Sequence, residues 1–174
     1  MRLTIVILIA TLAGCTSGRR LEDQAPNDFE QLLAVFDRPG TMIPDSLLLR
    51  TLHVDSFRLQ MGTFSALKRH NFSTNVLGLI YRMDCQAGGL CTATYMAIFN
   101  DRNYVDKLEI AHEYADGTFE NSLSYEISKN NIRLKLKQID ITEDINGNEV
   151  ENSTADSTSI YSINANTGRI DKEK

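Results

Sequence analysis

The stretch from Val76 to Asn164 constrains the fold most, because it consists of short apolar or alternating runs separated by turn signals. Val76–Asp84 and Cys91–Asn100 are apolar at both parities, which is typical of strands covered on both faces. Thr118–Ser128 instead alternates, which predicts a strand with one wet face. Its expected inward residues are Phe119, Leu123, Tyr125 and Ile127, and its outward residues are Glu120, Ser122, Ser124 and Glu126. The same alternation in Tyr104–Tyr114 places Leu108, Ile110, His112 and Tyr114 on one face, opposite Lys107, Glu109 and Glu113.

Turn signals and one irregularity divide the rest of this region. Asp116-Gly117 and Asn146-Gly147 predict tight hairpin turns. In the strand between these turns, the apolar residues shift from one set of alternate positions to the other. A bulge near Lys137-Gln138 would return the two groups of apolar residues to one face. Those groups are Ile132, Leu134 and Leu136, followed by Ile139 and Ile141. Glu151–Ser157 is polar and is interpreted as a loop or ragged edge, and Thr158–Asn164 as the last strand.

Helices are expected before the strands. Asn27 or Asp28 resembles a helix cap, and Arg38-Pro39-Gly40 ends the helix. Its apolar face is Phe29, Leu32, Leu33 and Phe36. Pro44–Leu52 fits either a second helix or a strand, and Ser65–His70 a short helical turn. The fold class is therefore α+β, with one to three N-terminal helices packed on an antiparallel meander of about six strands, near the two doubly apolar runs. A β-sandwich or half-barrel is the alternative.

The N-terminal segment is short and largely apolar. Leu3–Leu12 is an apolar run that would form about 15 Å of helix, half of what a bilayer core needs. Leu12-Ala13-Gly14-Cys15 resembles the lipobox of bacterial lipoproteins, in which the cysteine is lipidated and the chain is cut just before it. The resemblance implies a signal peptide over residues 1–14, a lipidated tether over 15–27 with lipid on Cys15, and one globular domain over 28–174.

The resemblance also implies a location in the cell envelope. Thr16, where an Asp would favour inner-membrane retention in enteric-type lipoproteins, points to the outer membrane. With its Asn-rich acidic strands, the chain is similar to small Bacteroidota lipoproteins of unknown function. The chain has a net charge of −5, and loss of Arg2 with the signal peptide makes it −6. That charge argues against a nucleic-acid partner, so the expected partners are the membrane, through the lipid, and an envelope protein.

Two cysteines remain for the domain, Cys85 and Cys91. Export would place this pair in an oxidising compartment, where free thiols do not persist. Gly88-Gly89 between the two cysteines predicts a hairpin turn that would bring them together. A structural disulfide is therefore predicted. A redox pair or a metal site is the alternative, although the spacing is wider than Cys-x-x-Cys and no further ligand lies nearby.

The sequence contains no recognisable catalytic motif. It has neither a Gly-x-Ser-x-Gly elbow nor a His-Glu-x-x-His pair. His112 is interpreted as a hydrogen-bonded core residue, and His53 and His70 have no evident partner. Asp144–Asn148 has the wrong spacing for a calcium loop and is interpreted as a turn. We therefore expect no catalytic, cofactor or metal site, and a non-enzymatic accessory or binding module. The alternative is an envelope hydrolase or a small-molecule carrier.

Overall fold

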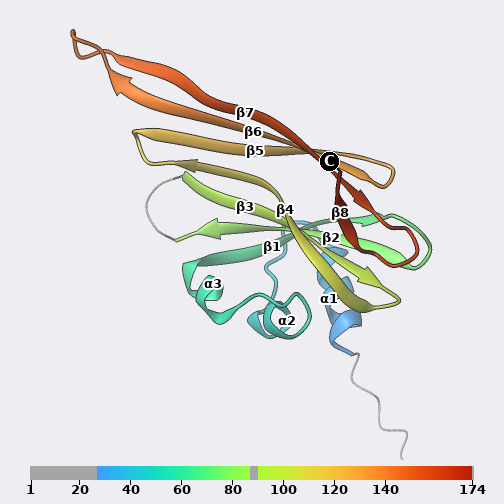
Figure 1. Ribbon diagram of the computed structural model, residues 1–174. Helices are drawn as coiled ribbons and strands as arrows, with labels where there is room; N and C mark the ends of the chain where they lie inside the picture. The colour runs from blue at the N-terminus through green and yellow to red at the C-terminus, as the bar shows by residue number, and fades with distance from the viewer. Residues whose placement is uncertain (1–26, 87–89, 174) are drawn as a thin grey trace, which may run out of the picture.

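The computed structural model describes residues 27–86 and 90–173, and it confirms the α+β class (Figure 1). Three short helices come first: α1 (Asp28–Phe36), α2 (Asp45–Arg50) and α3 (Ser56–Met61). The strands that follow are β1 (Gly62–Asn71), β2 (Val76–Cys85), β3 (Leu90–Asn100), β4 (Asn103–Ala115), β5 (Phe119–Ser128), β6 (Asn131–Glu143), β7 (Glu149–Ile163) and β8 (Ile170–Lys172).

The helices begin where local chemistry favours them. The side chain of Asn27 accepts a hydrogen bond from the Glu30 amide and so caps α1, as predicted. Of the two alternatives for Pro44–Leu52, the helix is correct: the Pro44 carbonyl accepts from the amides of Leu47 and Leu48. Both leucines are buried, so α2 is held by packing against the core rather than by its length.

The sheet is an antiparallel meander in which each strand pairs with the next in the chain. It contains eight strands within the described residues, where about six were expected. The prediction of a helical turn at Ser65–His70 was wrong, because these residues lie inside β1. The other missed strand, β8, is short and pairs only with the end of β7.

The doubly apolar strands β2 and β3 separate two hydrophobic cores. On one face, the helices bury Leu32, Phe36 and Leu48 against the first core. The other face carries the second core, in which side chains from β2 and β3 meet side chains from β6 and β7. Because these two pairs of strands are far apart in the sheet order, the sheet must curl over itself. The curled sheet is not closed, since β1 and β8 are not paired with each other. Among the residues at the centre of the second core are Ile80, Met96, Ile98, Ile110, Ile132 and Ile163.

The curl begins at β4, where two extra residues bend the strand. Thr94 pairs with Ala111 but Tyr95 pairs with Glu109, so Ile110 is the extra residue of a bulge. Val105 is likewise the extra residue of a second bulge in β4. Only the last four residues of β4 pair with β5, so the sheet passes from one layer to the other here.

The first of these bulges overturns the predicted faces of Tyr104–Tyr114. Cross-strand partners point to the same face, and His112 pairs with Ala93 of the first core. Leu108 and Ile110 pack in the second core instead, and Tyr114 is 47% exposed. The bulge shifts the alternation by one residue, so His112 shares a face with Glu109 and not with Ile110.

The predicted irregularity in the next hairpin lies at the expected position but on the other strand. Gln138 pairs with Ala155 and Ile139 with Ser153, so the extra residue, Thr154, belongs to β7. β6 pairs with β5 without a break, and Ile139 therefore does not rejoin the parity of Ile132. Ile139 is buried, but it belongs to neither core.

The predicted loop at Glu151–Ser157 was also wrong, because these residues continue β7. Backbone hydrogen bonds with β6 hold these residues in a strand, although their side chains bury little apolar surface. The two predicted hairpin turns are confirmed: Gly117 and Gly147 have φ of +92° and +79°, which glycine adopts without strain. The alternation of β5 is confirmed as well, with its inward residues half-buried.

Candidate functional site

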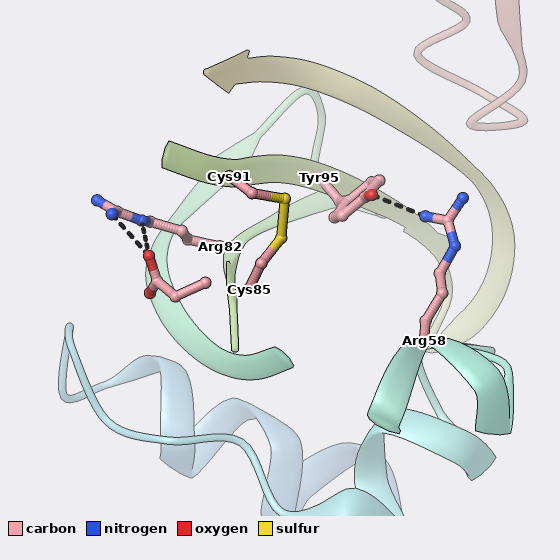
Figure 2. The surroundings of a disulfide bond; sticks show 6 residues. Arg58, Arg82, Cys85, Cys91 and Tyr95 are labelled. Atoms are coloured by element: carbon pink, nitrogen blue, oxygen red, sulfur yellow. Dashed lines mark hydrogen bonds and ion pairs between the residues drawn. A yellow bond between two sulfur atoms is a disulfide. The ribbon is translucent and has the colours of Figure 1, made fainter. Parts of the chain in front are cut away.

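The structure places Cys85 and Cys91 as the sequence predicted, at the ends of β2 and β3 (Figure 2). Their sulfur atoms lie 1.98 Å apart, at bonding distance, and their Cα atoms 5.4 Å apart. The pair continues the antiparallel register by one position beyond Asp84 and Thr92. The disulfide therefore closes the neck of this hairpin. The predicted turn at Gly88-Gly89 lies outside the described residues.

The predicted signal peptide (1–14), Cys15 and all but the last residue of the tether (15–27) also lie outside the described residues. Among the helices of the described part, none is long and apolar enough to cross a membrane.

A chain of polar side chains, here called the Tyr95 network, connects four elements near the disulfide. It consists of Arg58, Tyr95, Glu109, His112 and Asn121. Arg58 of α3 donates to the Tyr95 hydroxyl at 2.7 Å, on the side of the disulfide away from Arg82 (Figure 2). The Asp55 carboxylate caps α3 and lies 3.5 Å from the Arg58 guanidinium, which fixes the position of Arg58. Burial raises the pKa of Tyr95, and the charge of Glu109 raises it further.

The bulge in β4 produces the second half of the network. His112 Nδ1 lies 2.6 Å from Glu109 Oε1, and His112 Nε2 lies 2.9 Å from Asn121 Oδ1 of β5. His112 is therefore hydrogen-bonded, as the sequence predicted, but it is not a core residue, because its side chain is 23% exposed. The imidazole ring is thus held between a carboxylate of its own strand and a side-chain amide of β5.

A second cation lies beside the same tyrosine. Lys107 Nζ is 5.8 Å from the centre of the Tyr95 ring, and the Arg58 guanidinium carbon is 5.3 Å from it. Burial lowers the pKa of Lys107, and the charge of Arg58 lowers it further. The histidine left unassigned in this region, His53, stacks on Tyr104 at 4.4 Å between ring centres.

Tyr81 of β2 lies beneath this region and is fully buried. Its ring packs against Tyr95 at 5.6 Å between centres. Its hydroxyl has no hydrogen-bond partner within the described residues, and burial raises its pKa far above the ordinary value.

A cleft of about 300 Å³ borders the Tyr95 network, because His112 is one of its lining residues. Its walls include Arg82, Thr94, Ser124 and Tyr125. Arg82 is tied to Asp84 through Nε at 2.7 Å and Nη2 at 2.6 Å. Lys68 Nζ lies 5.5 Å from the centre of the Tyr125 ring. The cleft is thus lined by hydroxyl, aromatic and ion-paired groups, which can donate and accept hydrogen bonds.

The remaining sequence candidates have structural roles. Asp144 accepts from the amides of Asn146 and Asn148, so its carboxylate organises the β6–β7 turn. His70 Nε2 lies 3.4 Å from the Lys129 carbonyl oxygen, and the His70 ring packs against Phe72. Within residues 27–86 and 90–173, no group of three or more His, Cys, Asp or Glu side chains has the arrangement of a metal site.

Sequence reasoning missed the Tyr95 network. Its members are far apart in the chain, and the one local pair, Glu109 and His112, belongs to opposite faces of a regular strand. Only a bulge brings them together, and nothing in the run Leu108–Ala111 signals one.

The comparisons with known proteins found no match: no family model, no curated protein and no solved structure is significantly similar to the chain.

Proposed function

We propose that the protein is a lipoprotein of the cell envelope, anchored by lipid on Cys15 in the outer membrane, and that it acts as a non-enzymatic binding module. The observation that carries the anchor is the sequence Leu12-Ala13-Gly14-Cys15 at the end of an apolar run. Two or more acyl chains make such an anchor stable, whereas one gives only marginal binding.

The shape of the domain supports the binding role. The ends of β5, β6 and β7 reach beyond the part of the sheet that the helices cover (Figure 1). Side chains on both faces of this projecting ribbon are exposed, among them Ile145 and Val150 at its tip. An exposed ribbon of this kind offers a surface to a partner without disturbing either core.

The carrier alternative would need an apolar cavity inside the curl of the sheet. That space is occupied by side chains such as Ile80, Met96 and Ile110, each 0% exposed. We therefore base the proposal on surface binding.

The anchor is tested by metabolic labelling of the full chain with a radioactive fatty acid in a bacterial host. We expect labelling and membrane fractionation of the native chain, and an unlabelled precursor for Cys15→Ser. The double variant Cys85→Ser/Cys91→Ser is the matched control and should stay labelled. Equal labelling of the Cys15→Ser chain would refute the proposal.

A further inference from the structure

The outer edge of β7 pairs with no other described strand over most of its length. Within the described residues, β7 lies between β6 and β8, and β8 pairs only with Tyr161–Ile163. The Glu173 amide donates to the Ile160 carbonyl, which leaves Glu149–Ser159 as the open edge. The other end of the sheet differs, because residues 40–43 bond along the edge of β1 through the backbones of Phe64 and Ala66.

An open edge offers a row of backbone donors and acceptors to another strand. Natural sheets often block such edges with proline or lysine, and β7 contains neither. Of the side chains described from Glu149 to Thr158, all except Ala155 are exposed. The extra residue at Thr154 divides the edge into two stretches. Each is long enough for a short strand to pair with.

The charge of β7 indicates what kind of strand would fit. The strand carries Glu149, Glu151 and Asp156 and no cationic residue. The end of β6 adds Glu143 and the adjoining turn adds Asp144, whereas Lys135 and Lys137 of β6 face Thr158 and Asp156 across the ladder. A second copy of β7 would bring three more carboxylates to the edge and no cation. A basic strand would place the Cβ atoms of its residues about 5 Å from the Cβ atoms of the acidic residues directly opposite.

We propose that the β7 edge binds an extended, basic segment of a partner protein by strand addition. The proposal rests on the binding role proposed above and names its partner chemistry. Backbone pairing supplies the affinity, and the carboxylates select for lysine and arginine. The exposed Val150 and Ile145 lie at the start of the edge, where they can contact an apolar residue at one end of the segment.

The test uses the full chain in detergent and a capped peptide of about nine residues, with alternating lysine and threonine. Two further probes are the same peptide with glutamate for lysine, and the same peptide with every amide N-methylated. The methylated peptide keeps its charges but cannot donate to the edge. We expect the basic peptide alone to bind, and to slow amide exchange in Glu149–Ser159 on the order of tenfold, with no change in β5.

Charge variants give a second readout. The double variant Glu149→Gln/Glu151→Gln should bind the basic peptide about three- to tenfold more weakly than the parent chain does. The control Glu120→Gln/Glu126→Gln removes the same charge from the wet face of β5 and should leave its affinity unchanged.

Three outcomes would overturn the proposal. Equal binding of the methylated peptide would mean general charge attraction, and unchanged exchange in β7 would mean binding elsewhere. A dimer that forms without peptide and protects β7 would assign the edge to a second copy. None of these outcomes depends on lipid at Cys15, so the labelling experiment can fail or succeed independently.

Discussion

At the scale of single residues, the two tyrosine hydroxyls under α3 differ in their partners. Tyr95 accepts from Arg58, whereas Tyr81 is buried and unpartnered within the described residues. A buried polar group without a partner destabilises the folded state, and its removal can be neutral or stabilising. Removal of the hydroxyl should therefore destabilise the protein at Tyr95 but not at Tyr81.

We expect Tyr95→Phe to lower the free energy of unfolding by about 1 kcal/mol, because Arg58 loses its acceptor. Tyr81→Phe should leave it unchanged or raise it by up to about 1 kcal/mol. Urea denaturation of the two variants and the parent chain measures both. A loss at Tyr81 equal to that at Tyr95 would show that the Tyr81 hydroxyl has a partner.

The pairing of Cys85 and Cys91 is a second residue-scale prediction. Alkylation of the unfolded chain should add two more adducts to the domain cysteines after reduction than before it, measured by intact mass. Replacing both by serine should lower stability by about 2–2.5 kcal/mol in the chain-entropy model for this short loop. Full alkylation of both residues without reductant would contradict the pairing.

At the scale of elements, β4 and β7 show how backbone pairing overrides side-chain pattern. Ile110 bulges from β4, so residues that alternate in sequence do not alternate in space. β7 is polar enough to read as a loop, yet most of its residues pair with β6. In both strands, the neighbouring strand decides the structure, because the ladder bonds depend on the backbone and not on side-chain polarity.

The sidedness of β6 gives a prediction at this scale. Ile132 is fully buried in the second core, and the next residue, Arg133, is exposed. Ile132→Ala should lower the free energy of unfolding by about 2–5 kcal/mol, through lost burial and a cavity. Arg133→Ala should change it by less than about 0.5 kcal/mol. Denaturant midpoints decide the matter, and equal losses would mean that the outer face of β6 is covered too.

At the scale of the whole molecule, the tyrosines on the helix face link stability to pH. Burial raises the pKa of Tyr81, Tyr95 and Tyr104 above the ordinary value of about 10. Above that value the unfolded chain loses these protons and the folded chain keeps them. The free energy of unfolding should therefore fall as pH rises beyond about 10.

Lys107 acts in the opposite direction, because its pKa is lowered and its deprotonation relieves the folded state as pH rises. Three tyrosines outweigh one lysine, so the net change is a loss. Urea midpoints between about pH 9 and 11 measure it, with Tyr81→Phe expected to flatten the decline. A midpoint that rises over this range would contradict the assignment of these tyrosines as protonated in the folded chain.

The sequence by itself was enough for the helix cap at Asn27, the turns at Gly117 and Gly147, the alternation of β5 and the α+β class. These features depend on contacts between near neighbours in the chain or on a period that one strand displays alone. It was also enough to bring Cys85 and Cys91 together, since one hairpin relates them.

Only the tertiary structure decided which residues share a surface. The second core joins β2 and β3 to β6 and β7 because the sheet curls at β4, and the Tyr95 network exists because a bulge turns His112 toward Glu109. In the part of the chain that the structure describes, the open edge of β7 likewise follows from the shortness of β8. Such features come from pairing between strands, and a chain's own periodicity carries no record of the register its neighbours impose.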